Sequence, residues 1–234
     1  MYIAVIIPCF NHADILRRTL EGLSIQSLKP VEVVVIDDGS EDNPETVVRD
    51  FVDRLPIKFH KLYKNHGAPY VRNLGARMTT APLIIFLDAD AELVPNALEF
   101  FALELESNTD ADFVYSNFFW GIKRFKARAF NFDALKKRNY IHTSSLMRRS
   151  CFPGFDESLK KFQDWDLWLN MAERGSRGVW INHELYRIEP RRQGMSRWMP
   201  RIAYLVPWSR FGFMPKELTK YRQAEEIVRK KHGI

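Results

Sequence analysis

The sequence predicts an α/β fold in which a mostly parallel central sheet is covered by helices on both faces. Short apolar runs alternate with segments whose apolar residues recur at helical spacing, the rhythm of strand–helix–strand units. The runs are continuously apolar, as expected for strands buried on both sides. The 234 residues, 46% hydrophobic and 27% charged, suffice for one large domain with a modest appendage.

The first half of the chain carries this pattern most clearly. We expect strands at 2–7, 31–36, 57–62 and 83–87, and helices at 11–26, 45–55, 68–79 and 95–105. The last helix is placed to begin at Pro95, because proline is favoured in the first turn.

The second half is less regular. We expect strands at 111–120, 142–147 and 178–181, and helices at 164–174 and 216–231. Repeated prolines interrupt the pattern after Arg187. The predicted division is therefore a domain over 1–187, with halves 1–105 and 106–187, and an extension over 188–234.

The basic charge of the chain belongs to this extension. From Tyr186 onward there are 12 Lys/Arg and 4 Asp/Glu (+8), which leaves 23 of 35 bases and 25 of 29 acids (−2) for the rest. Aromatic and basic residues alternate here: Trp198, Tyr204, Trp208, Phe211 and Phe213 with Arg197, Arg201 and Arg210. Such a tail suits an anionic membrane surface; packing on the domain, a dimer contact or a solvated basic face are the alternatives.

Cellular location is predicted from absent signals. Cys9 and Cys151 are in no metal-ligand or redox spacing, which favours a reducing compartment. No apolar run is long enough to span a bilayer, and residues 1–8 lack the basic start of a signal peptide. We expect a cytoplasmic protein, with the tail as a peripheral contact at the inner face of the membrane.

Polar residues follow three of the predicted strands, at 8–11, 37–40 and 88–90. Ligands of open α/β sheets bind beyond the carboxyl ends of the strands, so these segments are expected to meet at one rim. Asp88 and Asp90 supply the hard oxygen ligands that Mg²⁺ or Mn²⁺ prefers, and such an ion neutralises a diphosphate leaving group. Turn or capping aspartates are the alternative.

Four segments in order make the pattern specific: Val5-Ile6-Ile7-Pro8-Cys9-Phe10-Asn11, Val35-Ile36-Asp37-Asp38-Gly39-Ser40, Arg72-Asn73-Leu74-Gly75 and Phe86-Leu87-Asp88-Ala89-Asp90. With them the sequence resembles glycosyltransferase family 2, inverting enzymes of the GT-A fold, a Rossmann-like α/β/α sandwich. The resemblance runs from about residue 2 to about residue 186. It implies a nucleotide-sugar-binding half at 1–105 and an acceptor-binding half at 106–187.

The resemblance also implies roles for single residues. The nucleotide-sugar site is expected to contain Pro8, Phe10, Asn11, Asp38, Arg72 and Asp88. Asp90 is expected to bind the Mn²⁺ or Mg²⁺ ion directly, with Asp88 beside it. A UDP-sugar is the commonest donor in the family, and thymidine or guanosine donors fit the same motifs. For Arg72 an exposed helix position is the alternative, since arginine is usually exposed.

The base that activates the acceptor hydroxyl is expected at Asp164, which matches the family's acidic pair at a helix start. The preceding residue is Gln163, where glutamate is common. Asp166 is a rival for the base, and either aspartate also suits a plain helix cap. Trp165 is expected to stack on an acceptor sugar, with a core position as the alternative.

The third protein ligand of the metal is less well defined. Many family members have a histidine shortly after a Tyr-Arg pair, and here Tyr186-Arg187-Ile188 is followed by Glu189. Glu189 is the expected oxygen ligand, and His183 is the alternative.

The predicted function is metal-dependent transfer of a hexose-type sugar to a saccharide or lipid-linked saccharide, as in polysaccharide biosynthesis. The alternatives are a polyprenyl-phosphate glycosyltransferase, a non-catalytic sugar-nucleotide-binding domain, and a nucleic-acid-binding module that uses the basic tail. The acidic rim argues against nucleic acid, because its carboxylates repel phosphates.

Overall fold

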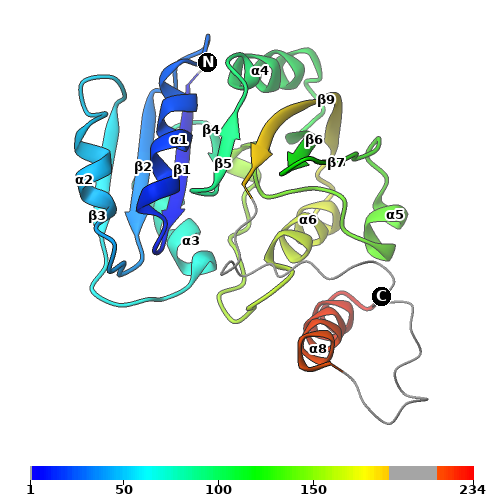
Figure 1. Ribbon diagram of the computed structural model, residues 1–234. Helices are drawn as coiled ribbons and strands as arrows, with labels where there is room; N and C mark the ends of the chain where they lie inside the picture. Colours follow the sequence, from blue (N-terminus) through cyan, green and yellow to red (C-terminus); the bar gives the residue numbers. More distant parts are fainter. Residues whose placement is uncertain (1, 190–214) are drawn as a thin grey trace.

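The computed structural model describes residues 2–189 and 215–234, and there nine strands form a single mixed sheet (Figure 1). The strands follow the order β3-β2-β1-β4-β8-β6-β9-β5, with β7 paired to β6. Their bounds are β1 (Ile3–Cys9), β2 (Glu32–Asp37), β3 (Ile57–Lys61), β4 (Leu83–Phe86), β5 (Ala91–Leu93), β6 (Phe113–Trp120), β7 (Lys123–Phe125), β8 (Leu146–Arg148) and β9 (Gly178–Ile188).

The two halves of the sheet differ in strand direction. β1 pairs in parallel with β2 and β4, and β2 with β3. β8 is antiparallel to both β4 and β6, whereas β9 is parallel to β6 and antiparallel to β5. The predicted α/β fold is confirmed, but the sheet is mixed and not mostly parallel. Four strand pairs are parallel, three of them in the first half, and four are antiparallel.

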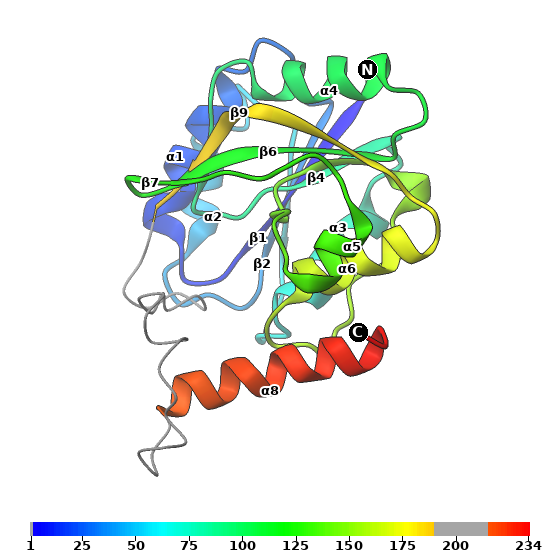
Figure 2. The same cartoon turned by 90° about the vertical axis from the view of Figure 1, so that its right-hand side faces the viewer.

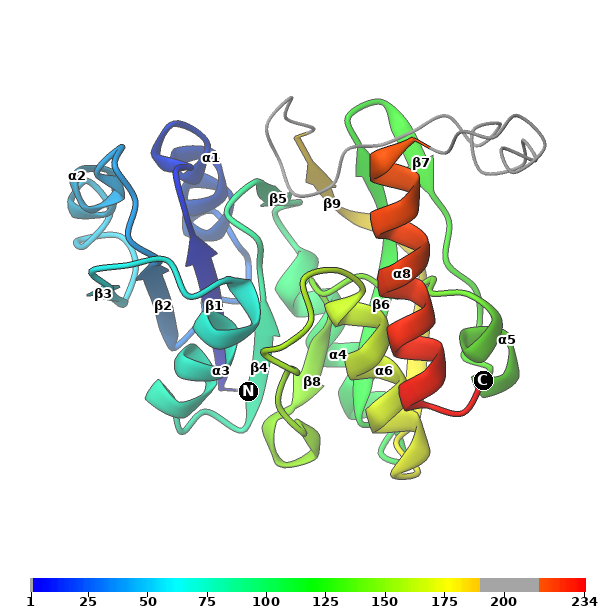
Figure 3. The same ribbon diagram turned by 90° about the horizontal axis from the view of Figure 1, so that it is seen from below.

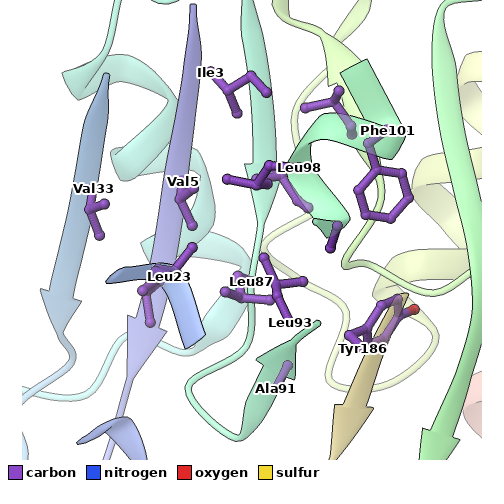
Figure 4. Packing of buried hydrophobic residues seen from close by; sticks show 14 of the residues in the cluster. Ile3, Val5, Leu23, Val33, Leu87, Ala91, Leu93, Leu98, Phe101 and Tyr186 are labelled. Atoms are coloured by element: carbon purple, nitrogen blue, oxygen red, sulfur yellow. The ribbon is translucent and has the colours of Figure 1, made fainter. Parts of the chain in front are cut away.

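Helices cover both faces of the sheet and enclose two cores. One core lies under α1 (Ala13–Ser24), α2 (Pro44–Arg49) and α4 (Ala97–Ser107); the other lies under α3 (Ala68–Met78), α5 (Phe132–Lys137), α6 (Gln163–Glu173) and α8 (Lys216–Lys231). A short 3₁₀ turn covers Arg149–Cys151. Strand residues alternate between the cores. In β1, Ile3 and Val5 face the first core (Figure 4), whereas Ala4 and Ile6 belong to the second.

Several predicted elements differ from the structure. The strand expected at 142–147 covers only Leu146–Arg148, which leaves His142 in a loop, and the strand expected at 178–181 continues to Ile188. α2 ends at Arg49, and α4 begins at Ala97, so Pro95 precedes that helix. The elements β5, β7 and α5 were not expected, because three to six residues are too few to display a period.

α8 packs beside α6, as Figures 2 and 3 show. It buries Leu218 and Val228, and the chain after it places His232 Nε2 2.9 Å from Asp166 Oδ1. No helix of the described ranges is long and apolar enough to cross a membrane.

The aromatic and basic tail residues, Arg197, Trp198, Arg201, Tyr204, Trp208, Arg210, Phe211 and Phe213, lie outside the described residues. The membrane contact expected of them, and the division of the chain at residue 187, stay predictions.

Gly75 gives a test of the packing between α3 and β1. A Cβ atom there would lie 2.3 Å from Ile6 Cγ2 in the core strand. We expect Gly75→Ala to lower the free energy of unfolding by about 1–3 kcal/mol, because the helix must move away from the sheet. Urea denaturation measures this change.

The matched control is Gly22→Ala in α1, where the nearest atom to an added Cβ is 3.3 Å away. Alanine there gains helix propensity of up to about 1 kcal/mol, but the added Cβ lies 3.3 Å from the backbone oxygen of Leu93, so we expect only a small net change. Equal losses in the two variants would contradict the proposed close contact.

Candidate active site

A cavity of about 390 Å³, here called the donor cavity, lies beyond the ends of β1, β2 and β4. Its walls include Pro8, Phe10, His12, Asp38, Arg72, Asp88, Asp90, Trp120 and His142. The expected convergence of the three polar segments is therefore observed. Asn11 and Glu189, also expected at this site, are not in its walls.

Asp38 organises the loop before α3. Its two carboxylate oxygens accept hydrogen bonds from the backbone N–H groups of His66 and Gly67, both at 2.8 Å. Burial raises the pKa of Asp38, although these N–H groups oppose the change. The following Gly39 has φ +77°, and a Cβ there would lie 2.9 Å from the backbone of Lys64. The Asp-Gly pair thus shapes one wall of the donor cavity.

Asn11 joins the loops after β1 and β2. Its backbone N–H donates to Ser40 Oγ at 2.9 Å, and its Oδ1 accepts from the N–H of Glu41 at 2.9 Å. Asn11 has φ +53°, a left-handed conformation that asparagine tolerates better than most residues. The residue therefore supports the rim beside the cavity.

Arg72 and Asp88 form a partly buried ion pair in the wall of the site, with Asp88 more exposed than Arg72. Arg72 Nη2 lies 2.6 Å from Asp88 Oδ1, and Arg72 Nη1 donates to Gln163 Oε1 at 3.0 Å. Arg72 is only 5% exposed, so the alternative of a surface arginine is wrong. Burial opposes ionisation of Asp88, but the charge of Arg72 and its hydrogen bond outweigh burial and lower the pKa of Asp88.

Asn73, the next residue of the motif, fixes the chain that leads to α6. Its amide donates to Phe155 O at 2.9 Å and accepts from Phe155 N at 2.8 Å. The Arg-Asn pair therefore connects α3 to both the acidic rim and the start of α6.

His142 was not expected in the site. Its Nε2 lies 3.9 Å from Asp88 Oδ2, and its ring packs against Phe118 and Tyr186. Burial lowers the pKa of His142, although Asp88 and Asp164 oppose the change, and this favours the neutral imidazole. The residue lies in no recognised motif, so only the position of its loop reveals it.

A second cavity of about 460 Å³, here called the acceptor cavity, adjoins the donor cavity. Arg72, Asp88, Trp120 and His142 line both. The expected base Asp164 lines the acceptor cavity, where its Oδ2 accepts from Asn139 Nδ2 at 2.7 Å. Burial raises the pKa of Asp164, although His142 opposes the change.

Asp164 and its rival Asp166 face different surroundings. Asp166 is fully buried, lies 2.7 Å from Lys231 Nζ and is in the wall of neither cavity. Phe162, just before the helix, has φ +60°, and its ring meets Tyr221 of α8 with centroids 4.8 Å apart. Contact with α8 thus fixes the helix so that Asp164 faces the cavity.

Trp165 is 2% exposed, and its indole N–H donates to Leu135 O at 2.7 Å. It borders the acceptor cavity with a small part of its surface. Most of the ring is core, so stacking on a sugar as the sequence suggested would need the ring to be uncovered.

Asp88 and Asp90 are the carboxylates that could hold a divalent ion in the donor cavity. The Glu189 carboxylate instead pairs with Arg18 at 3.3 Å, and the backbone N–H of Glu189 donates to Asp90 O at 3.1 Å. The alternative ligand, His183, is exposed on β9. Within 2–189 and 215–234 no group of three or more His, Cys, Asp or Glu side chains is arranged to hold a metal. Two carboxylates still fit Mg²⁺ or Mn²⁺, because substrate phosphates and waters commonly complete such sites.

Comparison with known proteins decides the family. The sequence model described as "Glycosyl transferase family 2" matches residues 4–156, more than half of the chain. The chain belongs to glycosyl transferase family 2. Among its relatives in this family, validoxylamine A glucosyltransferase of Streptomyces hygroscopicus subsp. jinggangensis is 45% identical over 89 residues, 37% of this chain and 21% of that protein.

Solved family 2-like structures support the GT-A fold. TarS residues 1–349 of S. aureus, crystallised with UDP-GlcNAc, gives a TM-score of 0.75 at 19% identity, over 85% of this chain and 62% of that one. The mannosyltransferase PcManGT of Pyrobaculum calidifontis, in complex with GDP-Man and Mn²⁺, gives 0.66 at 18% identity, over 97% and 69%. This chain therefore spans a fifth of the validoxylamine enzyme and under two thirds of the TarS fragment.

Loss of the Arg72–Asp88 ion pair is expected to lower the stability of the fold. We expect Arg72→Met to lower the free energy of unfolding by about 3–5 kcal/mol near neutral pH, because Asp88 loses its buried partner. Urea denaturation followed by circular dichroism measures it. Arg77→Met, at an exposed position of the same helix, is the control and is expected to stay within about 0.5 kcal/mol. Similar values for both variants would show that Arg72 is not compensating a buried charge.

Proposed function

We propose that this family 2 enzyme transfers a sugar, with inversion, from a nucleoside-diphosphate sugar to a hydroxyl of a saccharide or lipid-linked saccharide. The observation that carries the proposal is the common wall of the donor and acceptor cavities. Arg72, Asp88, Trp120 and His142 border both, while Asp90 lines the donor cavity alone and Asp164 the acceptor cavity alone. If the anomeric carbon of the donor sugar lies where the two cavities meet, the base is on its acceptor side and the diphosphate-binding groups are on its donor side.

The nucleotide half of the proposal is supported by two structural relatives. TarS is described with UDP-GlcNAc and PcManGT with GDP-Man and Mn²⁺. A UDP-sugar is our first expectation, and the panel described below includes the other bases.

In the proposed reaction Asp164 accepts the proton of the acceptor hydroxyl. The oxygen then attacks the anomeric carbon from the face opposite the nucleotide, and the bond from that carbon to the diphosphate breaks. A carboxylate whose pKa is raised by burial is a better proton acceptor than an exposed aspartate. Asn139, which donates to Asp164 Oδ2, holds this carboxylate in position.

The reaction also requires that the negative charge on the departing diphosphate be stabilised. Arg72 supplies a fixed positive charge at the floor of both cavities. Asp90 and Asp88 would hold a divalent ion, which when bound supplies further positive charge to the diphosphate. Neutral His142 beside Asp88 adds no charge and fills the space between the two cavities.

Nucleotide binding gives the first functional test. In thermal-shift assays with UDP, dTDP, GDP, CDP or ATP, each with Mn²⁺, Mg²⁺ or EDTA, we expect one nucleoside diphosphate to raise the melting temperature. A ligand at about 100 times its Kd stabilises the native state by about 2.7 kcal/mol. The increase should vanish with EDTA and in Asp90→Asn.

The control for this substitution is Asp53→Asn, which removes an exposed aspartate outside the cavity walls. A folded protein that no nucleotide stabilises would argue for a non-catalytic family member. A shift that persists in EDTA would support the nucleotide site and contradict the proposed role of the metal.

The base gives the second functional test, once a donor is known. We expect Asp164→Asn to lower kcat by about 10²–10⁴-fold, the usual contribution of a general base. In the unaltered enzyme, kcat should fall as pH falls through the pKa of Asp164, because only the carboxylate accepts a proton. Since burial raises that pKa, the midpoint should lie above about 3.9, the ordinary aspartate value.

Rates measured against pH, with Asp53→Asn as control, check both statements. Full activity of Asp164→Asn would reject this base and favour an acceptor that is already an anion, such as a polyprenyl phosphate.

A further inference from the structure

A third cavity of about 450 Å³ continues the acceptor cavity past the end of α5. The two share Phe125, Lys137, Arg138 and Asn139. Because the two cavities adjoin at these residues, we treat them together as one groove, here called the acceptor groove, with Asp164 in the part formed by the acceptor cavity. A chain-like acceptor with its hydroxyl at Asp164 would run along this groove.

The acceptor groove is basic, in contrast to the donor cavity. Apart from the shared pair Arg72 and Asp88, six cationic and three carboxylate side chains line it: Lys126, Arg128, Lys137, Arg138, Lys160 and Lys161 against Asp133, Asp164 and Glu225. Two of these carboxylates already have cationic partners, Asp133 with Lys136 at 3.5 Å and Glu225 with Arg229 at 3.0 Å. The donor cavity has three aspartates and one arginine. The sign of the charge therefore reverses from one cavity to the next.

Among the described residues, five of the six groove cations have no carboxylate partner, and the sixth, Lys161, lies 4.0 Å from Glu217. In the part of the chain that the structure describes, no carboxylate lies within ion-pair distance of Lys137, Arg138 or Lys160. Lys126 and Arg128 instead lie over the rings of Trp180 and Tyr140, 5.9 and 6.0 Å from their centroids. Within 2–189 and 215–234 these cations form no ion pair, so we take their charge to be available to a ligand.

We propose that the acceptor is a polyol or saccharide chain that carries anionic groups, either phosphodiesters or uronate carboxylates. Its reacting hydroxyl lies at Asp164, and the anion of a neighbouring unit is bound by Lys137 and Arg138. These two residues border both parts of the groove, so any acceptor that leaves Asp164 in this direction passes them. The inference rests on the proposed function, since it names the acceptor class of the same site.

Binding of short labelled oligomers to the full chain, without donor, tests the inference. The probes are an oligo(glycerol phosphate), an oligogalacturonate and a neutral malto-oligosaccharide of equal length, followed by fluorescence anisotropy. We expect one anionic oligomer to bind, more weakly as salt rises, and the neutral one not to bind. Which anionic oligomer binds distinguishes phosphodiester from uronate.

The variant Lys137→Gln/Arg138→Gln should weaken that binding about tenfold, the sum of two modest ion pairs. Arg77→Gln/Lys230→Gln removes the same charge at exposed positions outside the groove and should leave the Kd unchanged. Equal melting temperatures of the two variants establish that both are folded. The inference is overturned if the neutral oligomer binds as tightly as the anionic ones, or if the two variants lose affinity equally.

This result is separable from the proposed function. If a nucleotide stabilises the protein but no oligomer binds, the proposed anionic acceptor is rejected and the proposed transferase function is still supported. If an oligomer binds in a manner that depends on Lys137 and Arg138 but no nucleotide stabilises the protein, the anion-binding groove is supported and the proposed transferase function is rejected.

Discussion

The partly buried ion pair between Arg72 and Asp88 joins three parts of the chain that the site needs in register. Arg72 belongs to α3, Asp88 follows β4, and the second guanidinium nitrogen of Arg72 reaches Gln163 at the start of α6. Burying a single charge here would cost several kcal/mol, so the pair and its hydrogen bonds must be retained together. The same guanidinium borders the donor and acceptor cavities, and their proposed division of labour follows from its position.

α6 is held from its other side by the end of the chain. Asp166 accepts from His232 and lies 2.7 Å from Lys231, while Tyr221 packs against Phe162. Each residue of a helix is rotated by about 100° from the one before it, so residues two apart point in nearly opposite directions. Anchoring Asp166 to the C-terminal segment therefore turns Asp164 toward the acceptor cavity. Tyr221 and Glu225 of α8 complete the wall of that cavity.

The first half of the fold and the acidic rim followed from the sequence because long periodic segments fix them. Continuous apolar runs placed β1, β2 and β4, and their ends brought Pro8, Asp38, Asp88 and Asp90 to one cavity. The burial of Arg72 was not predictable, since its ion partner is 16 positions away. His142 was hidden in a predicted strand, and its role depends on a loop whose course only tertiary packing sets. The different surroundings of Asp164, in the cavity wall, and Asp166, fully buried, depend on α8, which is far away in the sequence.

The common wall of the donor and acceptor cavities gives a route by which the occupants proposed for them would be coupled energetically. If a bound donor shifts Trp120 or His142 so that the acceptor binds more tightly, the acceptor must strengthen donor binding by the same factor. An inhibitor that fills one cavity would then have an affinity set by the contents of the other. In a cell, the concentration of one substrate would thereby set the apparent affinity of the enzyme for its co-substrate.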